Sequence, residues 1–171
     1  MTRKLPAIAL LIALGLCAPA AAIDVPQTRQ EFVQAVAAGR GASTVEHLTT
    51  NQPLDKVYPL LQERAGACLD VTVKRTAYVG YVERSSSDYT PSLRRVGKDR
   101  AEFTLQVAHN PRGVGHEPPP GGLFIMAADL RSIDGRRTEI VLYRSTMGVK
   151  KIVASLKEWF AAESTPCPKL K

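Results

Sequence analysis

The feature that most constrains the fold of this 171-residue chain is an amphipathic helix predicted near its C-terminus, over residues 149–163. Apolar residues recur there every three or four positions, from Val149 through Leu156 to Trp159 and Phe160, and they form one continuous stripe. A stripe that carries two large aromatic side chains must pack against another apolar surface. The preceding residues offer one, because from about 69 to 145 apolar positions alternate with polar ones, as in half-buried β-strands.

These alternating segments predict a sheet of about six strands. The predicted strands are 43–50, 69–82 in one or two pieces, 89–96, 101–109, 123–133 and 138–144. Asp134-Gly135 predicts a tight hairpin and Gly97-Lys98-Asp99 a turn. The serines at 85–87, next to an aspartate, predict a further turn. The expected fold class is therefore α+β, with a curved, mostly antiparallel sheet packed on the long C-terminal helix.

Two further helices are predicted nearer the N-terminus. Residues 28–39 begin with Thr28 three positions before a glutamate, which is the spacing of a capping box. A second helix begins near Asn51-Gln52-Pro53 and ends at Gly66. Pro59 is expected to kink or split that helix, because proline lacks the amide hydrogen that a helix interior needs.

The first 22 residues have the pattern of a signal peptide. Arg3 and Lys4 precede an apolar run over 5–16, and three alanines at 20–22 provide a cleavage site. Cleavage would leave 149 residues, from 171 minus 22. We therefore expect residues 23–42 to form an N-terminal helix and linker, and residues 43–171 to form a single α+β domain in the periplasm or cell envelope.

Cys17 offers a second way to process the N-terminus. Leu14-Gly15-Leu16-Cys17 resembles a bacterial lipobox, in which the cysteine is acylated and becomes the first residue. The alternative is that Cys17 is only an apolar residue of the signal peptide. Both alternatives place the mature domain outside the cytoplasm.

Two cysteines remain in the mature chain, Cys68 and Cys167. In an exported domain, two cysteines most simply form one disulfide bond. A metal pair or a catalytic thiol is the alternative, but neither cysteine has a nearby histidine or a second cysteine at ligand spacing. We therefore predict a Cys68–Cys167 disulfide that closes a loop of nearly the whole domain.

The composition and motifs exclude several functional classes. With 44% apolar and 23% charged residues, the chain is not disordered, and its single long apolar run excludes a multi-pass membrane protein. The length supports one domain rather than a multidomain enzyme. The sequence contains no G-x-S-x-G elbow, no H-E-x-x-H helix and no phosphate-binding G-x-x-x-x-G-K. We expect no enzymatic activity, no cofactor and no metal site.

The three histidines give only weak signals. His109 and His116 flank a loop over 110–122 that is rich in proline and glycine, and His116-Glu117 resembles half of a metal site. A solvated loop tip is the favoured interpretation. His47 is interpreted as a half-exposed strand residue, and a nucleophile within the serines at 85–87 is less favoured than a turn.

The net charge of +7 is partly concentrated at two predicted turns. The basic residues of these turns are Arg94, Arg95, Lys98 and Arg100 in one, and Arg131, Arg136 and Arg137 in the other. Two basic hairpin ends would suit an anionic membrane surface. Solvated turn charges are the alternative, and export argues against nucleic acid as a partner.

Two resemblances to known families complement these patterns. The order of strand, broken helix, antiparallel meander and C-terminal helix resembles the helix-grip fold of the START and birch-allergen-like superfamily, over about residues 43–162. The chain also looks like a family of small uncharacterised bacterial envelope lipoproteins. The segments that carry this resemblance are residues 32–39, Cys68-Leu69, Trp159 and Cys167-Pro168-x-Leu170. The second resemblance implies an exported, lipid-anchored protein with a disulfide and brings no activity. Leu16 departs from the small residue expected before the lipidated cysteine.

The resulting hypothesis is an envelope protein that binds a hydrophobic or amphiphilic small ligand between the sheet and the last helix. The predicted pocket residues are Phe103, Leu105, Val107, Phe124, Met126, Leu142, Val149, Ile152, Leu156 and Trp159. The loop 110–122 would act as a flap. The alternative is a structural or protein-interaction module in which the same side chains fill a core and no ligand binds. A small hydrolase is the third hypothesis.

Overall fold

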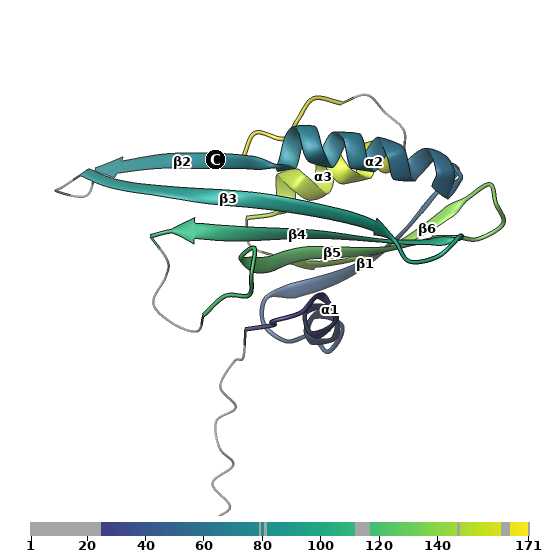
Figure 1. The fold of residues 1–171 in the computed structure, drawn as a ribbon, viewed down its shortest axis with the longest axis horizontal. Helices are drawn as coiled ribbons and strands as arrows, with labels where there is room; N and C mark the ends of the chain where they lie inside the picture. The colour runs from purple at the N-terminus through teal and green to yellow at the C-terminus, as the bar shows by residue number, and fades with distance from the viewer. Residues whose placement is uncertain are drawn as a thin grey trace, which may run out of the picture.

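A computed structural model describes residues 25–78, 80, 82–111, 117–146, 148–161 and 165–170. The predicted signal peptide, Cys17 and His116 lie outside these ranges. Within them the fold is α+β, as expected from the sequence, with a six-stranded antiparallel sheet that is not closed and three helices (Figure 1).

The elements follow one another in the predicted order. They are α1 (Arg29–Ala37), β1 (Ser43–Thr50), α2 (Leu54–Leu69), β2 (Val71–Tyr78), β3 (Val82–Arg95), β4 (Arg100–Asn110), β5 (Leu123–Ser132), β6 (Thr138–Ser145) and α3 (Lys150–Phe160). In space the strands are ordered β1-β6-β5-β4-β3-β2. Strands β2 to β6 therefore form the predicted meander, and β1 pairs with the last strand rather than with the next one along the chain.

Helices cover both faces of the sheet. Helices α2 and α3 lie on one face, which we call the inner face, and α1 lies on the outer face (Figure 1). The apolar stripe of α3 is buried as expected: Trp159 is only 1% exposed, and it shares a core with Phe103 of β4 and Leu61 of α2. The C-terminal helix thus packs beside α2 on the inner face of the sheet, as the sequence pattern required.

Helix α1 packs on the outer face through both apolar and charged contacts. Phe32 and Val36 are buried there, and the ring of Phe32 stacks on that of Phe124 with 6.0 Å between centroids. The Arg29 guanidinium donates hydrogen bonds to the Asp129 carboxylate and, at 3.0 Å, to the Ala128 carbonyl. Arg29 therefore fixes the start of α1 over β5.

Helix α2 corrects two expectations: it is not split at Pro59, and it continues beyond Gly66 to Leu69. Its N-cap position, Pro53, lies within the predicted start. Pro59 is exposed, whereas Val57, Leu61, Ala65, Cys68 and Leu69 along the same helix are buried. Burial of this continuous apolar face outweighs the loss of one helical hydrogen bond at proline.

Strand β3 corrects the turn predicted at residues 85–87. These serines lie within a strand that runs from Val82 to Arg95 and pairs with β2 on one side and β4 on the other. Serine has no strong strand preference, so the ladders on both sides determine the conformation here rather than local propensity. The turn predicted at Asp134-Gly135 is confirmed: the Asp134 side chain accepts hydrogen bonds from the amides of Arg136 and Arg137.

A charged clamp holds α3 to the edge of the sheet. The Glu46 carboxylate on β1 accepts hydrogen bonds from Arg144 on β6 and pairs with Lys157 on α3, each at 2.6 Å. These two cations, with the Lys157 hydrogen bond the larger effect, hold the pKa of Glu46 below its ordinary value despite partial burial. Across the sheet, burial and the nearby Asp129 carboxylate raise the pKa of Tyr143.

Candidate functional site at the open end of the inner face

The pocket predicted from the sequence is filled by its own side chains over most of its length. Nine of the ten predicted residues are at most 4% exposed. They are Phe103, Leu105, Val107, Met126, Leu142, Val149, Ile152, Leu156 and Trp159. Side chains buried to this degree pack at the density of an organic crystal. The middle of the inner face is therefore a packed core.

The tenth predicted residue, Phe124, lies on the other face of the sheet. It packs against α1 with Phe32, whereas Met126, two residues along, belongs to the core under α2 and α3. The cause is a register shift in the β4–β5 ladder, where Leu105 pairs with Met126 but Gln106 pairs with Phe124. The extra residue, Ile125, reverses the alternation of side chains before it. The prediction that Phe124 lies on the inner face is therefore wrong.

The inner face continues beyond the helices that cover it. Strands β2 and β3 extend past the end of α2 and the start of α3 (Figure 1). Cross-strand registers place Val71, Tyr89 and Val107 in one row. The next row outward contains Ser87 opposite His109, and the row after it contains Arg75 opposite Ser85. The face thus changes from apolar to polar as it leaves the helices.

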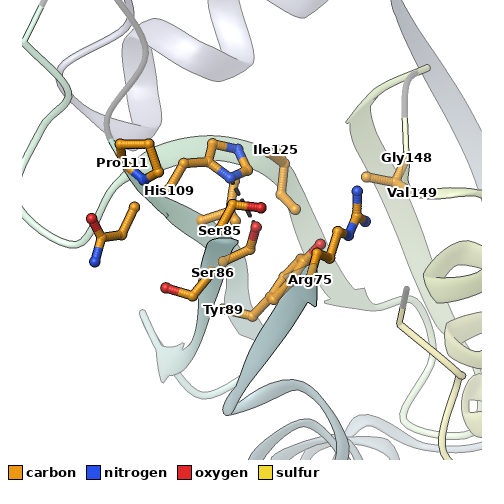
Figure 2. Close-up of a pocket in the computed structure, with 12 residues that line it drawn as sticks. Arg75, Ser85, Ser86, Tyr89, His109, Pro111, Ile125, Gly148 and Val149 are labelled. Carbon is orange, nitrogen blue, oxygen red and sulfur yellow. Dashed lines mark hydrogen bonds between the residues drawn. The ribbon is translucent and has the colours of Figure 1, made fainter. Parts of the chain in front are cut away.

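A pocket of about 320 Å³ lies at this transition. Its apolar side is formed by Tyr89, Val107, Ile125 and Val149, the last at the start of α3. Its polar side is formed by Arg75, Ser85, Ser87 and His109, and Figure 2 shows Arg75, Tyr89 and His109 around the same opening. Of the residues predicted to line a ligand site, only Val107 and Val149 line this pocket.

One hydrogen bond within the pocket joins two groups with possible chemical roles. The Ser87 hydroxyl and His109 Nδ1 are 2.9 Å apart. A serine nucleophile is normally activated by a histidine that a carboxylate orients. Among the described residues, His109 has no hydrogen bond to a carboxylate. The pair therefore provides polar contacts for a ligand but lacks the third member of a triad.

The described part of the loop 110–122 is attached to β4, although Glu117, Pro120 and Gly121 are exposed as expected for a loop. The Gln106 side-chain amide donates to the carbonyls of Pro120 and Gly122, at 3.0 and 2.8 Å. Gly122 is buried with φ +98°, and a Cβ atom there would lie 2.3 Å from the Val107 carbonyl oxygen. Only glycine fits such an approach. Pro120 and Gly122 are thus held against β4 on the side of Gln106 and Phe124, and none of residues 117–122 lines the pocket.

The predicted disulfide bond is present. Cys68 and Cys167 are bonded, with 5.1 Å between their Cα atoms. Cys68 is buried near the end of α2, and the bond attaches the C-terminal segment, whose Leu170 packs against the core. Such a bond between sequence positions 99 residues apart suggests an oxidising compartment outside the cytoplasm.

Other candidate sites are not assembled in the described residues. His47 is exposed on β1. No cluster of three or more His, Cys, Asp or Glu side chains in the described ranges has the arrangement of a metal site. Among the helices described, none combines the length and the apolar character required to span a bilayer. Comparison of the sequence with protein-family models and with curated proteins finds no match.

The sequence-based pocket missed ten of the twelve residues that line this one, among them Arg75, Ser85, Tyr89 and Ile125. Ile125 enters through the register shift, for which the sequence carries no glycine or other marker. Ser85 belongs to the segment that the sequence predicts as a turn. One signal in the sequence could have found Arg75. Val71, Val73 and Arg75 occupy alternate positions, which places two apolar residues and a cation on the same face of one strand.

Proposed function

We propose that this protein acts in the cell envelope and binds a small amphiphilic molecule with an anionic head group at the open end of the inner face. The observation that carries the proposal is the composition of the pocket. An apolar wall of Tyr89, Val107 and Ile125 meets a polar wall that contains Arg75 and His109. A ligand with an apolar chain and a carboxylate or phosphate group would satisfy both walls.

The fold supports this proposal. The first strand lies beside the last strand, and the final helix packs on the inner face. This arrangement resembles a helix-grip fold, in which the space between sheet and helix takes ligands. Here the middle of that space is filled, so the proposed ligand sits beyond the start of α3 rather than along it.

The proposal includes export and a possible lipid anchor. The sequence supports removal of residues 1–22, or acylation of Cys17, and the disulfide supports an oxidising compartment. Mass analysis of the mature N-terminus distinguishes the two routes. We expect either a chain that begins at Ile23 or one that begins at an acylated Cys17, and an intact Met1 would contradict both.

The binding test uses dodecanoate as the probe, measured by calorimetric titration of the disulfide-bonded protein. Arg75 and Lys74 are neighbours on β2, but only Arg75 lines the pocket. We expect Arg75→Gln to weaken binding about tenfold, the loss of one charge-assisted contact. The matched control Lys74→Gln removes the same charge from the other side of the strand and should bind as the wild type does. Equal losses in both variants, or no binding by the wild type, would contradict the proposal.

A second candidate function is an envelope interaction module that binds no small ligand. The packed core among Phe103, Leu105, Met126 and Trp159 favours it, because the predicted ligand space is occupied. Native mass spectrometry of protein purified from the envelope, followed by lipid extraction, separates the two candidates. A co-purifying amphiphile supports the pocket, whereas ligand-free protein that also fails to bind dodecanoate supports the interaction module.

A further inference from the structure

The two basic turns lie side by side at the end of the sheet opposite the pocket. One turn joins β3 to β4 and is closed by a hydrogen bond from the Val96 amide to the Arg100 carbonyl, at 3.1 Å. The other joins β5 to β6 and is closed by the Ile133 amide and the Arg137 carbonyl, at 3.0 Å. The Ser132 amide donates to the Asp99 carbonyl at 2.9 Å. This bond ties the two turns into one continuous surface.

Each turn exposes one large aliphatic side chain. Val96 is 40% exposed and Ile133 is 46% exposed, and only two other large apolar residues in the described ranges are comparably exposed. Those two, Tyr78 and Val82, lie together near the end of the β2–β3 hairpin, opposite each other in the ladder. Exposed aliphatic side chains on adjacent turns are suited to contact with an apolar layer.

The cations of this surface fall into two groups. Four arginines pair with carboxylates of the protein: Arg94 with Glu102, Arg95 with Asp55, Arg131 with Glu139 and Arg137 with Asp134. Lys98, Arg100 and Arg136 form no ion pair in the part of the chain that the structure describes. Within that same part, Asp99 is the one carboxylate of the two turns without an ion pair. The surface thus keeps an excess of positive charge around its apolar side chains.

We propose that these two turns dock on an anionic lipid bilayer. Val96 and Ile133 would enter the interfacial layer, and Lys98, Arg100 and Arg136 would lie at the level of the lipid phosphates. Charge complementarity favours a membrane because the unpaired cations lie on the same two turns as the exposed aliphatic side chains, as in segments that combine a basic patch with an apolar anchor. The inference is independent of the ligand pocket, which lies at the other end of the sheet.

The test is sedimentation with vesicles of phosphatidylcholine containing phosphatidylglycerol, compared with vesicles of phosphatidylcholine alone. We expect the protein to bind only the anionic vesicles, and less as the salt concentration rises. The triple variant Lys98→Gln/Arg100→Gln/Arg136→Gln should lose about 100-fold in partitioning, since each cation near an anionic surface contributes about fivefold. The variant Val96→Ser/Ile133→Ser should lose binding by about tenfold while keeping its charge.

Two matched controls make the test specific. Lys74→Gln/Lys150→Gln/Lys151→Gln removes three exposed cations elsewhere, and Tyr78→Ser/Val82→Ser removes the other exposed apolar pair. Both should bind anionic vesicles as the wild type does, with thermal melting confirming that every variant is folded. All proteins carry the same N-terminus, so any lipid anchor affects them equally. Equal binding to neutral vesicles, or equal losses in the controls, would overturn the proposal.

Discussion

The covered and open parts of the inner face belong to the same strands but have opposite roles. On the inner side of β4, Phe103 and Leu105 are fully buried under the helices, whereas His109, near the end of the same strand and on the same face, is exposed. The residues change from aromatic and aliphatic to polar where the cover of α2 and α3 stops. Helix length, rather than the sheet, therefore decides where the core ends and where a ligand site can form.

The open part still has a defined shape. Ser87 holds His109 across the β3–β4 ladder, with 2.9 Å between the hydroxyl and Nδ1. The polar side chains of the pocket are therefore positioned by ordinary sheet pairing, and they lie outside the buried core that stabilises the fold. We expect substitutions in the covered part to change stability and substitutions in the open part to change binding.

The largest difference in stability is expected between two variants on β4. Phe103→Ala should lower the free energy of unfolding by about 3–5 kcal/mol, because it leaves a cavity in the core. His109→Ala, in the same strand and on the same face, should change it by less than about 0.5 kcal/mol. Urea denaturation measures both values. Similar losses in the two variants would show that the two parts of the face do not differ as described.

The second-largest effect on stability concerns the disulfide bond near the boundary between the covered and open parts. Replacing Cys68 and Cys167 together by alanine should lower stability by about 2–5 kcal/mol, because the disulfide restricts a long loop in the unfolded chain. The measurement is the melting temperature under oxidising conditions. As a control, adding a reductant should bring the wild type to the melting temperature of the double variant. An unchanged melting temperature in the double variant would exclude the bond.

The smallest effect concerns the charged clamp on the covered part. Glu46→Gln should cost about 1 kcal/mol at pH 7, since a partly exposed carboxylate loses two charged partners. The pKa of Glu46 is lowered in the folded protein, so its contribution is present above the ordinary glutamate pKa and is lost as the pH falls through the folded value.

Urea denaturation between pH 7 and pH 3 tests the clamp. The difference between wild type and Glu46→Gln should shrink as the medium becomes acidic. The exposed Glu63 on α2 provides the matched control, and Glu63→Gln should differ little from the wild type at any pH. A difference that stays constant over this range would mean that Glu46 stabilises the fold by packing rather than by charge.

The sequence predicted the features that depend on strong periodicity. The stripe ending at Trp159 predicted α3 and its burial, and the alternation of Phe103, Leu105 and Val107 predicted β4 and its inner face. Cysteine count predicted the Cys68–Cys167 bond, because two thiols in an oxidising compartment leave one pairing. These features are set by the side chains within one element or by simple counting.

The sequence could not predict the features that depend on neighbouring elements. The register shift at Ile125 follows from how β4 and β5 pair, and it moved Phe124 to the outer face. The serines at 85–87 are in a strand because both neighbouring strands pair with them. Pro59 stays in a helix because α2 is held by its buried side. The open pocket depends on the first two of these effects, because Ile125 and the serines at 85–87 line it, so its location was missed.

The pairing of β1 with β6 has a consequence for how the protein matures. Ser43 lies opposite Ser145, and Thr50 opposite Thr138, so the first strand made finds its partner only when almost the whole chain is present. Contacts of such long sequence separation form slowly. A chain threaded through a membrane from its N-terminus would therefore carry β1 across unpaired and complete its sheet only after translocation ends, which keeps the polypeptide in a form that can still be transported.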